Sequence, residues 1–131
     1  MRKPKTVLVA EDEPDIRGLV VFSLEYAGLR VLQALNGEEA VEKAEEEQPD
    51  LILLDVRMPK MDGYDACREL KSQDSTKHIP VIFLSARGQE AEIKRGLGLG
   101  AVEYILKPFA PDELYRRVES ALQRFEREGD E

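Results

Sequence analysis

Five short hydrophobic runs alternate along the chain with longer stretches in which apolar residues recur every three or four positions. The runs lie at residues 6–10, 29–35, 51–55, 80–85 and 102–106. Runs this short that are rich in Val, Ile and Leu are typical of strands buried on both faces, whereas the stretches between them have the period of amphipathic helices. The pattern therefore predicts strands and helices in strict alternation.

The predicted helices place apolar residues on one face and charged residues on the other. They are expected at 16–27, 36–47, 64–70, 89–99 and 112–125, with Pro14 in the first turn before the earliest of them. The inward face of the first helix is predicted to consist of Ile16, Leu19, Val20, Leu24 and Ala27. The fourth helix contains Gly96 and Gly98, and an interior glycine costs ~1 kcal/mol against alanine. Its second half should therefore be weakly stable.

Alternating strands and helices in a chain of 131 residues indicate one α/β domain, with a parallel sheet covered by helices on both faces. We expect that domain over residues 1–125 and a frayed acidic tail at 126–131.

The net charge of −8 opposes direct binding to nucleic acid or to an anionic membrane surface. The single cysteine, Cys67, excludes an internal disulfide, and the chain shows neither a signal peptide nor ~20 consecutive apolar residues. A cytoplasmic location is expected.

Charged and polar residues stand where the predicted strands end. Glu11 and Asp12 follow the first strand, Asp55 and Ser85 close the third and fourth, and Lys107 follows the fifth. Parallel strands bring their carboxyl ends to one edge of a sheet, and carboxylates about 5 Å apart there repel by roughly 3 kcal/mol per pair. Such a cluster needs a cation, and oxygen ligands without histidine or thiolate favour Mg²⁺ or Mn²⁺ over zinc. A carboxylate beside a divalent cation and an ammonium group can accept a phosphoryl group.

These segments, in this order and spacing, resemble the receiver domain of bacterial two-component response regulators, including the chemotaxis regulators. The resemblance extends from about Lys5 to Arg124. It is carried by Glu11-Asp12, the LLDVRMPKMDG segment that contains Asp55, Phe83–Ala86 and Tyr104–Phe109. It implies a flavodoxin-like, doubly wound sheet of five parallel strands in the order 2-1-3-4-5, with five helices.

The resemblance also implies a phosphorylation-activated switch that is not an enzyme in its own right. Asp55 would accept a phosphoryl group from a histidine kinase or a phosphotransfer protein. Mg²⁺ would be held by Asp12, Asp55 and the backbone carbonyl of Arg57, with Glu11 acting through water. Lys107 would bind a phosphoryl oxygen.

Further residues of the resemblance would transmit the signal. Ser85 would move its hydroxyl onto the phosphoryl group, and Tyr104 would rotate inward, which reshapes the face formed by the fourth helix, fifth strand and fifth helix. The bond between Lys107 and Pro108 would be cis. Our hypothesis for Arg57 and Arg87 is that these long cations hinder the attacking water and lengthen the phosphorylated lifetime.

Two surfaces are candidate partner sites. Gly18, Val21 and Phe22 on the outer side of the first helix are predicted to dock the kinase. The pairs Arg95 with Glu113 and Glu103 with Arg117 resemble salt bridges across the dimer face of receivers attached to winged-helix DNA-binding domains. Val102 and Gly98 depart from that pattern, and the loop at 72–78 is more similar to stand-alone receivers or to those attached to second-messenger cyclases. The output, whether a separate protein or an attached effector domain, stays open.

Three other functions compete with the switch. A phosphatase of the haloacid dehalogenase type would need a second aspartate two residues after the nucleophile, where this chain has Arg57. A flavodoxin-like electron carrier would need a hydroxyl-rich phosphate loop, where this chain has Glu11-Asp12-Glu13. A receiver-like scaffold that never takes phosphate would not need Asp55, Ser85 and Lys107 together.

Overall fold

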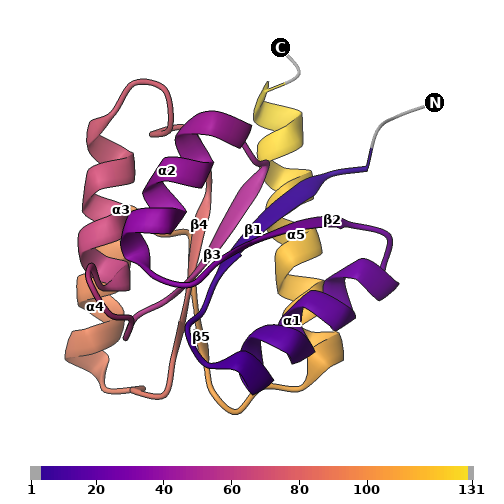
Figure 1. Cartoon of the computed structure of the whole chain (residues 1–131), viewed down its shortest axis with the longest axis horizontal. Helices are drawn as coiled ribbons and strands as arrows, with labels where there is room; N and C mark the ends of the chain where they lie inside the picture. The colour runs from indigo at the N-terminus through magenta and orange to yellow at the C-terminus, as the bar shows by residue number, and fades with distance from the viewer. Residues whose placement is uncertain (1–3, 130–131) are drawn as a thin grey trace.

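A parallel sheet of five strands forms the centre of the computed structural model, which describes residues 4–129. The strands are β1 (Thr6–Ala10), β2 (Arg30–Ala34), β3 (Leu51–Asp55), β4 (Val81–Ser85) and β5 (Glu103–Leu106). They lie in the order β2-β1-β3-β4-β5, and every neighbouring pair is parallel (Figure 1). The predicted fold class and strand order are confirmed, and each strand matches its predicted range to within one residue at either end.

Helices cover both faces of this sheet. They are α1 (Pro14–Tyr26), α2 (Gly37–Glu47), α3 (Gly63–Ser72), α4 (Glu90–Gly98) and α5 (Pro111–Gly129). α1 and α5 pack on one face, while α2, α3 and α4 pack on the other (Figure 1). α5 continues to Gly129 and not only to Phe125, because the charged residues that follow Phe125 are good helix formers. The end of the predicted tail, residues 130–131, lies outside the described residues.

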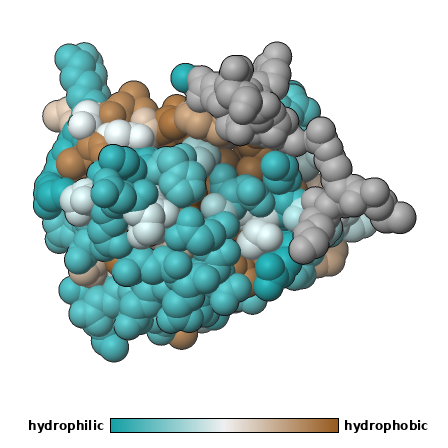
Figure 2. Space-filling view, turned by 90° about the horizontal axis from the view of Figure 1, so that it is seen from above, coloured by the Kyte–Doolittle hydropathy of each residue, from teal (hydrophilic) through white to brown (hydrophobic). Residues whose placement is uncertain are grey.

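The sheet separates two hydrophobic clusters. Residues that alternate along β1, β3 and β4 belong to opposite clusters: Leu8, Leu54 and Phe83 pack against α2–α4, whereas Val9, Leu53 and Ile82 pack against α1 and α5. All six are completely buried, as strands covered on both faces require. Seen from above, the surface is mainly hydrophilic (Figure 2), in keeping with a sequence in which 35% of residues are charged. Within residues 4–129, no helix has the length and apolar character needed to cross a membrane.

The inward face of α1 is narrower than the sequence predicts. Val20 and Leu24 are fully buried and Ile16 packs against the same cluster, but Leu19 is 44% exposed and Ala27 is also exposed. Successive helix positions are about 100° apart, so Leu19 points well away from the stripe through Val20. The assignment of Leu19 and Ala27 to the core was wrong.

Gly96 has a packing role that helix propensity does not reveal. A Cβ atom at this position would lie 2.9 Å from Cδ2 of Tyr104 and 3.0 Å from Cδ2 of Phe83. α4 therefore approaches the sheet closely only because residue 96 has no side chain. Gly98, two positions later, has open space where its Cβ would be.

The two glycines should respond to alanine in opposite directions. Gly96→Ala should lower the free energy of unfolding by about 1–3 kcal/mol, because overpacking against two aromatic rings outweighs the gain in helix propensity. Gly98→Ala should raise it by up to ~1 kcal/mol. Urea unfolding of the two variants measures both changes, and a Gly96→Ala protein as stable as Gly98→Ala would contradict this account of the contact.

Candidate functional site

The predicted site residues meet at the carboxyl edge of the sheet. Glu11 and Asp12 follow β1, and Asp55 is the last residue of β3, the strand that pairs with β1. Ser85 ends β4, and Lys107 follows β5. Five groups that are distant in the sequence are thus brought to one edge of the sheet because all the strands run in the same direction.

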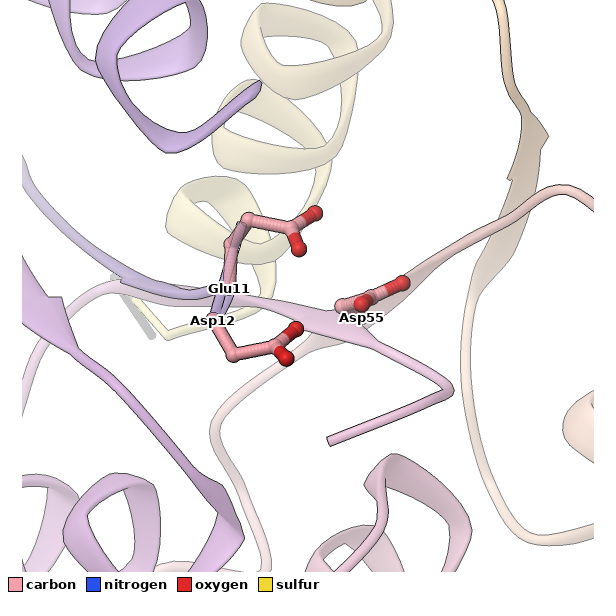
Figure 3. A group of neighbouring side chains, drawn as sticks. All are labelled: Glu11, Asp12 and Asp55. Carbon is pink, nitrogen blue, oxygen red and sulfur yellow. The ribbon is translucent and has the colours of Figure 1, made fainter. Parts of the chain in front are cut away.

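Three carboxylates form the acidic part of the site. Each of Glu11, Asp12 and Asp55 offers an oxygen, and these oxygens all lie within 4.8 Å of one another. Figure 3 shows the three side chains extending from the ends of the two neighbouring strands. Glu11 and Asp55 are buried, whereas Asp12 is exposed and leaves the cluster open to solvent. Two like charges at this separation repel by about 3 kcal/mol at an effective dielectric constant near 20.

Lys107 offsets part of this charge. Its Nζ donates to Oε1 of Glu11 at 2.8 Å and to Oδ1 of Asp55 at 2.9 Å. Burial opposes the charge on Lys107, but its hydrogen bonds to Glu11 and Asp55 outweigh burial and raise its pKa. One ammonium group against three carboxylates leaves the ionised cluster two charges negative. An open cluster of oxygen ligands with that excess charge fits a hard divalent cation such as Mg²⁺.

Glu11 is the carboxylate that the fold perturbs most. Burial, followed by the hydrogen bond from Lys107 and the charge of Asp55, sets its pKa, and the net effect raises the pKa from 4.5 to about 7. Its Oε2 also accepts a hydrogen bond from the backbone N–H of Glu13 at 3.2 Å. Glu11 is therefore held in place by the loop that carries Asp12.

Two positions of the site framework are not apparent from the chemistry of the sequence. Arg17 donates from Nη1 to the backbone carbonyls of Glu11, at 3.0 Å, and of Asp12, at 3.4 Å, so α1 fixes the acidic loop. A Cβ at Gly63 would lie 2.3 Å from the carbonyl oxygen of Asp55, so the start of α3 packs directly on the acceptor strand. The position of Arg17 near the start of α1, five residues after Asp12, was the available signal for the first of these.

Ser85 and Tyr104 are both buried next to this edge of the sheet. The Ser85 hydroxyl accepts a hydrogen bond from the backbone N–H of Arg87 at 3.0 Å. The resemblance implies that Tyr104 turns inward as part of the switch, and in this structure the ring already lies inward, with 8% of the residue exposed. Its hydroxyl donates to the carbonyl of Arg87 at 3.2 Å and lies 3.1 Å from the hydroxyl of Tyr64.

Arg57 and Arg87 line a hollow of about 340 Å³ that also borders Arg95. Both are exposed, in the loops that follow β3 and β4. They therefore share one hollow, and their predicted effect on dephosphorylation stays a prediction. The Lys107–Pro108 peptide bond is cis, as the resemblance implies.

The candidate docking residues lie on α1. Phe22 is 68% exposed and stacks on Tyr26, with ring centroids 6.1 Å apart. These two rings line a groove of about 470 Å³ between α1 and α5, together with Pro111 and Tyr115. Gly18 is exposed one turn before Phe22, whereas Val21 is only half-buried and does not line the groove.

The four candidate dimer residues are placed differently from one another. Arg117 forms an ion pair with Glu103 of the same chain at 2.8 Å. These two residues line a second, shallow hollow, which Glu113 also borders. Arg95 instead lies over the ring of Tyr64, 4.4 Å from its centroid. Glu103 and Arg117 are thus already paired within one chain.

Comparison with known proteins gives a family match over most of the chain. The family described as the response regulator receiver domain matches residues 7–119. The chain belongs to this family.

The receiver is 44% identical over 122 residues to the alkaline phosphatase synthesis transcriptional regulatory protein PhoP of Bacillus subtilis, covering 93% of this chain and 50% of PhoP. It is 42% identical over 120 residues to the phosphate regulon transcriptional regulatory protein PhoB of Escherichia coli, covering 92% of this chain and 52% of PhoB. The chain thus spans about half the length of these relatives.

Solved structures agree with this assignment. A response regulator from Chloroflexus aurantiacus is 35% identical, with a TM-score of 0.88, over 92% of this receiver and 99% of that chain. The receiver domain of sensor histidine kinase PA1611 from Pseudomonas aeruginosa, which holds a magnesium ion in its active-site cleft, is 32% identical, with a TM-score of 0.86. That comparison covers 92% of this receiver and 99% of the PA1611 chain. The cluster of Glu11, Asp12 and Asp55 is typical of the magnesium-binding phosphoacceptor site of receivers, and the phosphatase, electron-carrier and scaffold alternatives are not favoured.

The raised pKa of Glu11 predicts a pH dependence of stability in magnesium-free buffer. The folded carboxyl keeps its proton between pH 4.5 and about 7, a range in which the unfolded carboxyl has lost it. The free energy of unfolding should therefore fall as the pH rises through this range, by on the order of 1–3 kcal/mol.

Denaturant unfolding in EDTA at a series of pH values measures this dependence. Glu11→Gln is the matched control, because it keeps the side chain neutral at every pH and should lack this component. Parallel curves for the wild type and Glu11→Gln would contradict the assignment to Glu11.

Proposed function

We propose that this receiver is a signalling switch in which Asp55 takes a phosphoryl group from a phosphohistidine of a histidine kinase or phosphotransfer protein. The observation that carries the proposal is the position of the Asp55 carboxylate at the end of β3. It lies 2.9 Å from the ammonium of Lys107 and within 4.8 Å of the oxygens of Glu11 and Asp12. The Asp55 carboxylate is buried, and the exposed Asp12 beside it leaves the cluster open to a donor.

In the proposed reaction a carboxylate oxygen of Asp55 forms a bond to phosphorus while the phosphorus–nitrogen bond of the donor breaks. The electron pair of that bond stays on the imidazole nitrogen. Lys107 is already within hydrogen-bond distance of Asp55 and would bind a phosphoryl oxygen as charge accumulates there. The same group of residues would orient water for the later hydrolysis, so the domain assists both steps without turning over a free substrate.

The residues present fit a divalent cation in this reaction. Asp12, Asp55 and the backbone carbonyl of Arg57 would hold Mg²⁺, with Mn²⁺ as the closest substitute, and Glu11 would act through a water ligand. When bound, the ion offsets the negative charge on the phosphoryl oxygens. Glu11 suits an indirect contact because Lys107 already occupies its Oε1.

The output is proposed to pass through the face formed by α4, β5 and α5. Tyr104 of β5 and Ser85 of β4 would connect this face to Asp55, and the curated relatives are named as transcriptional regulators. We infer control of an attached effector domain or a separate output protein, with dimerisation through Arg95, Glu103, Glu113 and Arg117 as the accompanying step. With a net charge of −8 and a single cysteine, the domain is proposed to work in the cytoplasm without touching nucleic acid itself.

Phosphorylation at Asp55 is tested with acetyl phosphate and Mg²⁺, followed by intact mass measurement. The wild type should gain one phosphoryl group, and EDTA should prevent the gain. Asp55→Asn should gain none, because the amide is not a nucleophile, and a single cooperative melting transition would show that the variant is folded. An Asp55→Asn protein that gains the same mass would refute the role of Asp55.

Phe22 is expected to contribute to phosphoryl transfer from a protein donor and not from a small-molecule donor. Phe22→Ala removes most of an exposed ring from the groove and should slow transfer from a phosphorylated histidine kinase by about 10-fold or more, as loss of an interface anchor does. Phosphorylation by acetyl phosphate should be unchanged. Leu97→Ala is the matched control, because Leu97 is 44% exposed but lies on α4. Equal loss in both variants would contradict docking at α1.

Arg57 is expected to slow dephosphorylation. The hypothesis rests on its long cationic side chain, two residues after Asp55, in a hollow that it lines together with Arg87 and Val56. Arg57→Asn shortens that side chain and should speed phosphate release several-fold by opening the path of the attacking water. The release of phosphate from the purified phosphorylated protein gives the rate directly, and an unchanged or slower rate would count against a shielding role.

A further inference from the structure

Tyr64 lies in a hydrogen-bond chain to which none of the roles above assigns a purpose. It is the second residue of α3 and only 2% exposed. Its hydroxyl is 3.1 Å from that of Tyr104, 2.9 Å from Oε2 of Glu92 and 3.2 Å from the Glu92 carbonyl. A side chain from α3 thus joins β5 to α4.

The ring of Tyr64 is fixed as firmly as its hydroxyl. It meets Phe83 edge-on, with centroids 5.1 Å apart, and Arg95 lies over its face. Burial, reinforced by the hydrogen bonds to Tyr104 and Glu92, raises the pKa of Tyr64, so its hydroxyl keeps its proton. Tyr64 is therefore a permanent donor in a rigid position.

The number of hydroxyl protons decides which of these hydrogen bonds can form at the same time. Tyr64 and Tyr104 supply one hydroxyl proton each, but four contacts need one: Tyr64 to the Glu92 carboxylate, Tyr64 to the Glu92 carbonyl, Tyr64 to Tyr104 and Tyr104 to the Arg87 carbonyl. A bond to a carboxylate is about twice as strong as a neutral one. Tyr64 therefore donates to Glu92, and Tyr104 has a choice between the oxygen of Tyr64 and the carbonyl of Arg87.

From this geometry we infer that Tyr64 is a positioning residue, whose hydroxyl holds Tyr104 inward and ties α4 to it through Glu92. Tyr104 then has an inward partner that does not depend on the exposed loop containing Arg87. Because Gly96 has no side chain, α4 also packs closely against the Tyr104 ring. We call this hydrogen-bonded connection of Tyr64 with Tyr104 and Glu92 the link. Its effect on signalling rests on the proposed function, but the link itself does not.

The link is tested by fluorine NMR on protein labelled with 3-fluorotyrosine. The chain has four tyrosines and no tryptophan, so single Tyr→Phe variants assign every signal. Tyr64→Phe keeps the ring against Phe83 and removes only the hydroxyl. It should at least double the solvent isotope shift of the Tyr104 signal and speed hydrogen exchange of α4 amides about 10-fold.

Two further variants separate this link from a general loss of stability. Tyr115→Phe removes a similar tyrosine–glutamate bond on α5, 2.7 Å long to Glu119, and should leave Tyr104 and α4 unchanged. Glu92→Ala should speed exchange in α4 but leave Tyr104 inward, because Tyr64 is then free to donate to Tyr104. A Tyr64→Phe protein whose Tyr104 signal and α4 exchange match the wild type would overturn the inference, as would equal effects in Tyr115→Phe.

These measurements are made without a phosphodonor, so they do not depend on the proposed function. Tyr64 has no contact with Asp55 among its hydrogen bonds, and Tyr64→Phe should gain a phosphoryl group from acetyl phosphate to the same extent as the wild type, within about twofold. If no variant gains a phosphoryl group, the proposed function fails while the link can still hold. A loss of phosphorylation confined to Tyr64→Phe would count against a role restricted to Tyr104 and α4.

Discussion

Repulsion among Glu11, Asp12 and Asp55 is the constraint on which the rest of the site depends. Three carboxylates within 4.8 Å of one another are stable only beside positive charge, and Lys107 supplies one such charge from the far end of the chain. The remaining excess makes this edge of the sheet a site for a divalent cation and for a charged reaction. A bound divalent cation would relieve this repulsion.

The fold holds that arrangement in place by burying everything beneath it. β1 and β3 lie in the middle of the sheet, and Leu8, Val9, Leu53 and Leu54 below the site are completely buried on both faces. Close packing of this kind leaves the strand ends little room to separate in response to repulsion. Gly63 and Arg17 then fix the two loops, so the carboxylates stay close although their charges oppose it.

On the other side of Asp55 the structure has a second polar group, formed by Tyr64, Tyr104 and Glu92. In this group the hydroxyl protons are fewer than the contacts that need one. In the acidic site, by contrast, the cations are fewer than the carboxylates. The members of the second group come from α3, β5 and α4, the elements nearest the proposed output face. The acidic site is the proposed place of the reaction, and the tyrosine pair links β5 to α4.

Sequence alone determined the alternation of strands and helices, the parallel sheet and the polar residues that end the strands, because buried strands and their terminal charges leave a local pattern. It misassigned Leu19 and Ala27 to the core, because the part of a helix that is buried depends on what packs against it. For Gly96 it indicated only a low helix propensity and not the close approach of α4 to the sheet. Only the tertiary structure placed Tyr104 inward, paired Arg117 with Glu103, and joined Tyr64 to Glu92 and Tyr104. These contacts join elements that packing brings together, and no short segment of the chain encodes which side chains will meet.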